Sequence, residues 1–502
     1  MNESLRSKTA ANLTYSSVCR LLVFGLSSIT SIVLARNLNS SDYGIVGFAS
    51  IFVIFLGMFN DLGVTASIIQ KETIDENDLY TAFTLKLLLG LLIFLVSFVW
   101  GSVSQRAFEN PAVKAVVIVL GSSSLISAVG FLPTVVLTRE LKFKRLTIPQ
   151  IGGQVVATIV ALTSVYMGAR YWSLVFASLA SAAASAVIVF ALCPVRYRFR
   201  WDREVAKEHL RFGSHLFLAW LLAFVLFNSD NFAIGVLGGA AMLGFYSIAF
   251  NWSTKACNLI ESSIQGILLA TFSKVQKETE RLTRGYLTVL EYVSFAAVLA
   301  NVLLLILSRE LLTMVLGRGT GKWLPALTAL RILCVYGGVR AMVEPVGSMV
   351  TAIGRPDLLF KANAVVTCFQ VACLYPALRY WGLVGVAIVV TFSYALQLFI
   401  YFPVLRRELH LSYRAVFGSV QSALMAGCVL GAFGIISERF FGVSWLTLTV
   451  KLVFGTGLYL GAFGSLTGWR LFKDARDMAD AVFLKPRRSL SGGGGRACEK
   501  GE

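Results

Sequence analysis

The chain has 502 residues, of which 56% are hydrophobic and only 14% are charged, and its mean hydropathy is +0.73. A composition this apolar excludes an ordinary water-soluble domain and a disordered chain, and it is typical of a polytopic membrane protein. The formal net charge of +18 would suit nucleic acid, but the excess Lys and Arg lie mainly in loops and in the C-terminal tail. That distribution indicates anionic membrane lipids, and no nucleic acid, as the partner.

Fourteen apolar segments follow one another along the chain, each long enough to cross a bilayer core of about 30 Å. Runs such as Leu87 to Val99 do not alternate in the way that barrel strands do. The segments therefore predict helices and an all-α fold. They lie at 12–35, 44–67, 81–102, 115–137, 148–168, 172–193, 214–237, 240–265, 286–308, 324–350, 361–378, 382–404, 415–436 and 446–469.

The basic residues predict the topology. Arg6 and Lys8 precede the first segment, where we recognise no removable signal peptide. The basic stretch 196–211 falls on the same side of the membrane, which identifies that side as cytoplasmic. An even number of crossings then places both termini in the cytoplasm. The polar stretch 471–502, with four consecutive glycines, predicts a largely disordered tail.

An internal repeat with an offset of 200 residues divides the chain. The segment 34–49 is similar to 234–249, so that Gly44 aligns with Gly244. Each half contains six spans, and an even number of spans means that the halves share one orientation. We therefore expect an N-terminal lobe at 1–205, a C-terminal lobe at 206–410, two further helices at 411–470 and the tail at 471–502.

Apart from Lys361 at the first position of its span, eleven charged residues lie inside the predicted spans, where each would cost roughly 2.5 to 3.5 kcal/mol if it faced lipid. Lys86 and Lys451 lie close enough to span ends to extend toward the headgroups. Arg20, Lys255 and Arg340 lie near the middle of their spans, and they are the candidates for binding an anionic substrate.

Polar side chains at helical spacing accompany these charges. Asn251, Lys255 and Asn258 lie on one face of the eighth span, and Arg20 lies on a similar stripe of the first. Stripes of this kind predict that spans 1, 2, 7 and 8 line a cavity, with the two asparagines as further substrate-binding candidates.

Four acidic residues in the spans have two possible roles, and the sequence does not distinguish between them. They either pair with the buried cations or bind the H⁺ or Na⁺ that couples transport to a gradient. These residues are Asp61, Asp230, Glu261 and Glu344.

The remaining motifs predict neither a catalytic site nor a metal site. The cysteines and histidines have neither metal-ligand spacing nor the pattern of a catalytic triad, so we expect no catalytic residue, metal or cofactor. Gly317 to Lys322, GRGTGK, looks like a phosphate-binding loop but lacks the four-residue gap and the following Ser or Thr.

Five segments together resemble the Wzx-like polysaccharide flippases of the multidrug/oligosaccharidyl-lipid/polysaccharide exporter superfamily, over roughly residues 10–410. They are LARNLNSSDYGIVGFA, FNDLG, TRELKFKR, NSDNFAIGVLGGAAMLGFYSIAF and TAIGRPDLLFK. The resemblance implies two six-helix lobes in a V, a central cavity and alternating access. By similarity to lipid II flippases, it also implies a polyprenyl-tail groove beside spans 13 and 14.

The expected function is a bacterial inner-membrane flippase, not an enzyme, for a polyprenyl-diphosphate-linked oligosaccharide. A polysaccharide polymerase and chain-length machinery are candidate protein partners. One alternative is a multidrug cation exporter of the same superfamily, which would favour a net acidic cavity. The other is a membrane polysaccharide polymerase or ligase, which generally needs a large outer loop, whereas the longest one expected here has about 15 residues.

Overall fold

The computed structural model describes residues 3–71, 73–140, 142–274, 278–409 and 411–470. The expected tail at 471–502 lies outside the described residues. Every regular element in the described ranges is helical, which confirms the all-α fold. The elements are α1 Glu3–Asn37, α2 Ser40–Asp61, α3 Val64–Gln70, α4 Glu76–Phe108, α5 Pro111–Gly121, α6 Ser123–Arg139, α7 Phe143–Tyr166, α8 Trp172–Leu192, α9 Arg203–Lys274, α10 Thr279–Glu310, η1 Leu311–Val315, η2 Leu324–Ala326, α11 Leu327–Ala352, α12 Pro356–Leu409, α13 Tyr413–Phe440 and α14 Trp445–Thr467.

Two of these helices are long enough to cross the membrane twice. In the described part, 12 helical stretches are long and apolar enough to cross, and two of them, Phe217–Ser262 and Pro356–Arg407, have 46 and 52 residues. The backbone leaves helical geometry at Gly239 (φ 78°) in α9 and at Gly382 (φ 56°) in α12, a region that glycine enters without steric cost. Counting each stretch twice is consistent with the fourteen expected spans.

Hydrogen bonds join the two halves of each long helix. Within α9 the Tyr246 hydroxyl donates to Asp230 Oδ2 at 2.6 Å. Within α12 the Gln397 amide donates to Asn363 Oδ1 at 2.7 Å. Each long helix therefore folds back on itself as a helical hairpin.

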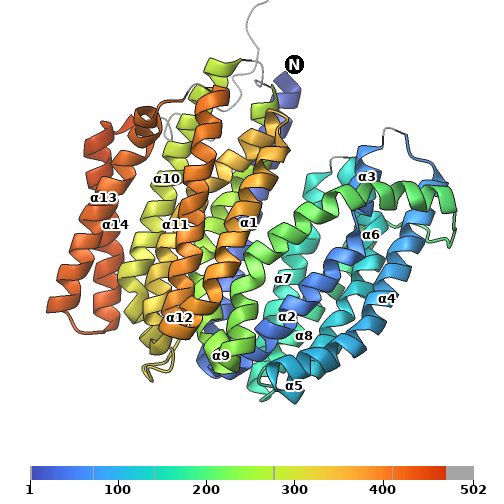
Figure 1. Cartoon of the computed structure of the whole chain (residues 1–502), viewed down its shortest axis with the longest axis horizontal. Helices are drawn as coiled ribbons and strands as arrows, with labels where there is room; N and C mark the ends of the chain where they lie inside the picture. The colour runs from blue at the N-terminus through green and yellow to red at the C-terminus, as the bar shows by residue number, and fades with distance from the viewer. Residues whose placement is uncertain (1–2, 72, 141, 275–277, 410, 471–502) are drawn as a thin grey trace, which may run out of the picture.

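The helices form two groups that separate toward the end at which α1 begins and meet at the opposite end (Figure 1). We call these the N-terminal end and the closed end of the bundle. In the first group α1 packs on α7, where Thr30 donates a hydrogen bond to Thr158 Oγ1 at 2.9 Å. In the second group α10, α11 and α12 pack on one another and on α9.

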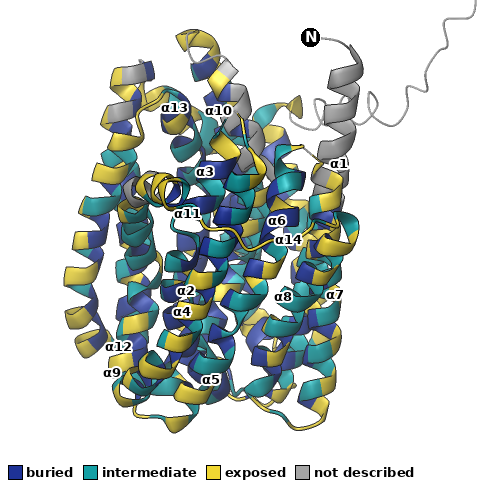
Figure 2. Cartoon of the chain, turned by 90° about the vertical axis from the view of Figure 1, so that its right-hand side faces the viewer, coloured by how far each residue is buried: buried dark blue, intermediate teal, exposed yellow. Residues whose placement is uncertain are grey.

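Apolar side chains face outward over the middle of the helices. Leu88, Leu92 and Leu95 of α4 are 50–56% exposed, and Figure 2 shows exposed positions repeating along this helix between buried ones. An exposed apolar face is expected where lipid replaces water as the solvent.

Ion pairs fix the last two helices to the second group, and one of these pairs is fully buried. Lys451 of α14 is 1% exposed, and its ammonium lies 2.6 Å from Glu310 Oε1. Arg331 of α11 pairs with Glu438 of α13. The expectation that Lys451 and Lys86 extend to the headgroups is wrong, because Lys86 is 7% exposed and pairs with Asp61 at 2.5 Å. A nearby carboxylate offers each ammonium a better partner than a distant headgroup.

The loop that resembled a phosphate-binding motif joins the two groups at the closed end. Lys322 Nζ donates to the carbonyl oxygens of Arg36 (3.0 Å) and Leu38 (2.8 Å), and the Trp323 indole donates to that of Ala35 (3.0 Å). The last carbonyls of a helix lack partners within it, and a cation there also meets the negative end of the helix dipole. This loop therefore caps α1 from the other group.

Candidate functional site

A cavity of about 650 Å³ lies between the two groups. Its described lining residues come from α1, α2, α7 and the second half of α9. They are Cys19, Arg20, Val23, Phe24, Ser27, Ser31, Tyr43, Thr147, Gln150, Ile248, Asn251, Lys255, Asn258, Leu259 and Ser262. A mixture of polar, charged and apolar walls at this volume is typical of a ligand site.

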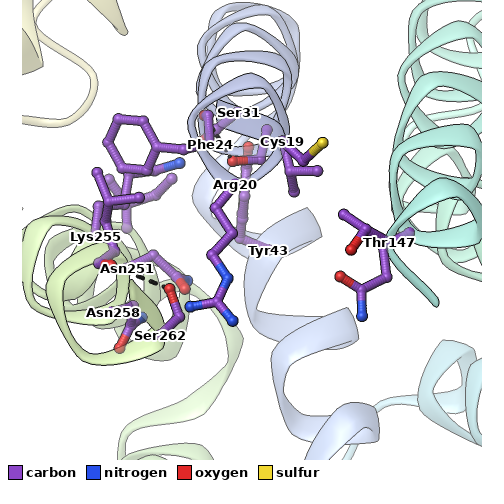
Figure 3. A pocket seen from close by; sticks show the side chains of 15 residues that line it. Cys19, Arg20, Phe24, Ser31, Tyr43, Thr147, Asn251, Lys255, Asn258 and Ser262 are labelled. Atoms are coloured by element: carbon purple, nitrogen blue, oxygen red, sulfur yellow. Dashed lines mark hydrogen bonds between the residues drawn. The ribbon is translucent and has the colours of Figure 1, made fainter. Parts of the chain in front are cut away.

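The polar lining of α9 follows from its sequence spacing. Asn251, Lys255, Asn258 and Ser262 succeed one another at steps of four, three and four residues, which places them on one helix face. In Figure 3 this face is turned toward Arg20, whose guanidinium points into the space between α1 and α9. The structure therefore brings four of the five substrate-binding candidates to one cavity.

Lys255 is half-buried in this wall. Its ammonium lies 3.3 Å from Ser28 Oγ, and it faces the rings of Trp252 (5.1 Å to the centroid) and Phe24 (5.8 Å). Aromatic faces stabilise a cation without neutralising it. The charge of Lys255 consequently remains available to a ligand.

The cations inside the spans fall into two classes. Lys86, Arg331, Arg340 and Lys451 each have a carboxylate partner within 4 Å. Among the described residues no carboxylate lies within that distance of Arg20 or Lys255, so the cavity holds two cations without a carboxylate partner in this part of the chain.

Arg340, the fifth substrate-binding candidate, lies in a separate cluster. Its Nη2 is 3.0 Å from Glu261 Oε2, its Nε is 3.8 Å from Glu344 Oε1, and its guanidinium covers the Phe227 ring at 5.5 Å. The cluster combines one guanidinium with two carboxylates, so its fully ionised form carries a net negative charge.

The other two acidic candidates also lie outside the set of lining residues. Asp61 accepts hydrogen bonds from Lys86 and Thr65, each at 2.5 Å. Asp230 is 2% exposed and accepts from Tyr246 and Asn231. In this conformation both carboxylates hold neighbouring helical segments together.

Sequence reasoning missed the contribution of α7. Thr147 and Gln150 both line the cavity, and Figure 3 shows Thr147 across it from Arg20. The spans expected to line the cavity did not include this helix. The spacing of three residues between Thr147 and Gln150 on one helix face beside Pro149 was a usable signal. Helix α2 contributes only Tyr43, just before the predicted start of span 2, and no residue within the predicted spans 2 and 7 is among the described lining residues.

The described residues contain no group of three His, Cys, Asp or Glu side chains that could hold a metal ion. The side chains that line the cavity offer a ligand two cations, several amides and several hydroxyls.

Two helical lobes enclosing a polar cavity within the membrane define a transporter of the alternating-access type. The chain belongs to the polysaccharide biosynthesis protein family, whose model matches residues 33–328. It is 24% identical over 425 residues to the lipopolysaccharide biosynthesis protein WzxC of Escherichia coli K12, covering 82% of this chain and 84% of that one. It is also 24% identical over 417 residues to the teichuronic acid biosynthesis protein TuaB of Bacillus subtilis 168, covering 81% and 85%.

Solved structures share the fold. The lipid II flippase MurJ in an inward closed conformation matches with a TM-score of 0.75 at 13% identity, over 91% of this chain and all of that one. An inward-facing multidrug resistance transporter of the MATE family matches with a TM-score of 0.65 at 17% identity, over 78% and 98%. At these identities the likeness concerns the fold alone.

Proposed function

We propose that this protein is a flippase that moves a polyprenyl-diphosphate-linked oligosaccharide from the cytoplasmic to the periplasmic leaflet of a bacterial inner membrane. The product would serve exopolysaccharide, capsule or O-antigen assembly. Family membership supports a role in polysaccharide biosynthesis, and WzxC and TuaB are both named for such pathways. A lipid-linked substrate is supported by the fold shared with a lipid II flippase.

The single observation that carries the proposal is the pair of uncompensated cations in the cavity. Arg20 and Lys255 both line it, and no described carboxylate lies within ion-pair distance of either. Unpaired charges inside a membrane protein are expensive, so they are expected where a ligand supplies the opposite charge. A diphosphate does so, and both side chains donate charge-assisted hydrogen bonds to phosphate oxygens.

The remaining lining suits the sugars. Asn251, Asn258 and Ser262 of α9 and Gln150 of α7 offer donors and acceptors that match the hydroxyls of an oligosaccharide. Phe24 adds an apolar surface beside them. We propose that the N-terminal end of the bundle faces the cytoplasm together with both termini, so that the substrate enters the cavity from that side.

Removal of either cation tests this assignment. Arg20→Ala and Lys255→Ala are each expected to slow export about 10- to 100-fold, the value of one lost hydrogen bond to a charged group. The readout is lipid-linked oligosaccharide accumulating in the cytoplasmic leaflet of a complemented deletion strain. Arg414→Ala removes an exposed cation outside the cavity and serves as the matched control. Unimpaired export by both well-expressed cavity variants would refute the site.

The Arg340 cluster is our candidate for coupling to a gradient. A buried group with two carboxylates and one guanidinium is stabilised when it takes up one H⁺ or Na⁺. Glu344→Gln is then expected to retain binding but lose the response of transport to a pH or Na⁺ gradient, measured in inverted membrane vesicles. A full response in this variant would leave Glu344 a structural role only.

A multidrug cation exporter is disfavoured by the same cavity, because two unpaired cations repel a cationic drug. A drug-efflux assay on the strain that tests Arg20→Ala separates the two functions.

A further inference from the structure

The connection between α8 and α9 lies on the outer face of the N-terminal lobe. The backbone N–H of Arg200 donates to Thr84 Oγ1 of α4 at 3.2 Å, and the Tyr197 hydroxyl donates to the carbonyl oxygen of Val129 of α6. The Tyr197 ring also packs on Phe83, with 4.8 Å between the centroids. One edge of this non-helical segment is therefore attached to two membrane helices.

The segment presents three arginines on its other edge. In an extended chain successive side chains point in opposite directions, and side chains two residues apart lie on the same side, roughly 6.4 to 6.8 Å from each other. Val195 and Tyr197 pack against the lobe, whereas Arg196, Arg198 and Arg200 are exposed. We call these three residues the arginine strip.

The arginine strip has no pairing carboxylate within 4 Å in the described part of the chain. The acidic side chain nearest in sequence, Asp202, accepts from the Asn77 amide at 2.9 Å and from the backbone N–H of Glu204 at 3.0 Å. It is thereby engaged in starting α9. Glu208 lies 3.2 Å from Lys71. The three guanidiniums thus retain their charge toward the surroundings.

Exposed aromatic residues accompany the strip. Phe199 is 76% exposed and Trp201 is 54% exposed. The apolar helix α8 ends at Leu192, just before the strip, and the first turns of α9 (green) cross the N-terminal end of the lobe in Figure 1. Aromatic and basic residues together at the end of an apolar helix are typical of the headgroup layer.

We propose that Arg196, Arg198 and Arg200 form a binding site for the phosphate headgroups of anionic phospholipids in the adjacent leaflet. Guanidinium forks match phosphate oxygens in geometry and in charge. Lipid-linked substrate carries phosphate too, but the cavity is lined from α1, α2, α7 and α9, whereas the strip lies on α4 and α6. The strip therefore faces the bulk lipid of the leaflet.

Lipid binding at this site stabilises the start of α9. The strip leads directly into its first turns, which Lys71 and Ser67 hold to the lobe through Glu208 and His209. Neutralising the charge of the strip with bound phosphate removes the repulsion among its three guanidiniums. Anionic lipid is thus expected to raise the thermal stability of the lobe.

Purified full-length protein in nanodiscs tests the proposal. The discs contain phosphatidylcholine alone, with phosphatidylglycerol, or with phosphatidylglycerol and undecaprenyl diphosphate together. The readouts are the lipid retained in native mass spectrometry and the gain in Tm. R196Q/R198Q/R200Q is expected to weaken retention by about fivefold per arginine, or about a hundredfold in all. R196K/R198K/R200K keeps the charge and is expected to retain most of the binding.

R406Q/R407Q/R414Q removes the same charge from three exposed arginines near the junction of α12 and α13, and it is expected to retain the lipid. Equal losses in this control and in the strip variant would mean general electrostatic attraction and would overturn a site. Unchanged retention in the strip variant, or retention of undecaprenyl diphosphate in place of phosphatidylglycerol, would overturn it as well. If the triple variant fails to match the wild-type Tm in phosphatidylcholine, phosphatidylglycerol retention by the single variant R198Q is the deciding measurement. No readout uses transport, so the flippase assignment is tested separately.

Discussion

Gly44 of α2 and Gly244 of α9 pack on each other's helices through reciprocal contacts at the closed end of the cavity. A methyl group on Gly44 would lie 1.8 Å from the carbonyl oxygen of Ala240, and one on Gly244 would lie 1.8 Å from that of Ser40. Ser40 and Ala240 are separated by the same 200 residues as the two glycines. The internal repeat thus forms a local two-fold contact, as expected for parallel halves related by an axis along the membrane normal.

Replacing either glycine is expected to force the two helices apart. A new methyl group would meet backbone, which cannot rotate away as a side chain can, so Gly44→Ala and Gly244→Ala should each cost about 1 to 3 kcal/mol of stability. Chemical unfolding in detergent measures the loss. Gly25→Ala adds the same methyl group to α1 with no atom within 4 Å and should be neutral or stabilising. If all three variants unfold alike, the close crossing is not present in solution.

The loop that caps α1 should keep this end of the cavity shut. Lys322→Met removes two hydrogen bonds to carbonyl oxygens at the C-terminal end of α1, that of Arg36 in its last turn and that of Leu38 just beyond it. Because a hydrogen bond to a charged group contributes about 1.5 kcal/mol or more, the loss should raise the open population at least tenfold. The assay labels a cysteine at the cavity residue Ser31 with an impermeant maleimide from the periplasmic side, in a background without the eight native cysteines. Arg318→Met removes an exposed cation of the same loop and should leave labelling slow; equal labelling of both variants would contradict the cap.

The sequence predicts the helices far better than their pairing. Apolar length predicts fourteen spans, and helical spacing places Asn251, Lys255 and Asn258 on one face, because both depend on neighbours in the chain. Which cation pairs with which carboxylate depends on tertiary contacts. The sequence predicts the pairing of Arg340 with Glu344, four residues later, but not its pairing with Glu261, 79 residues earlier. For the same reason nothing local distinguishes Lys255, which has no carboxylate partner in the described part, from the paired lysines.

The ion pair between Lys451 and Glu310 should be needed to hold α14 in place. Both side chains are at most 2% exposed, so Lys451→Met leaves a buried carboxylate without its partner and should cost about 3 to 5 kcal/mol. The double variant Lys451→Met/Glu310→Gln removes both charges and should recover much of that loss. Thermal unfolding in detergent is the measurement. A double variant that loses as much as the sum of the single variants would show that the two charges do not interact.

Stability should fall in mild acid because of His209 in the first turns of α9. His209 is fully buried, and its Nδ1 lies 2.8 Å from Ser67 Oγ. Burial lowers the pKa of the imidazole, and the positive charge of Lys71 lowers it further. The negative charges of Asp78 and Glu208 raise this pKa but do not outweigh burial. A lowered pKa means that the unfolded chain, near its ordinary pKa of about 6.5, takes up the proton first. The stabilisation is therefore complete above about pH 6.5 and is lost as the pH falls through the pKa of the folded state. Thermal unfolding between about pH 7.5 and pH 5 should show this loss in the wild type and a flatter profile in His209→Gln. Parallel profiles for the two proteins would assign the acid sensitivity to other groups.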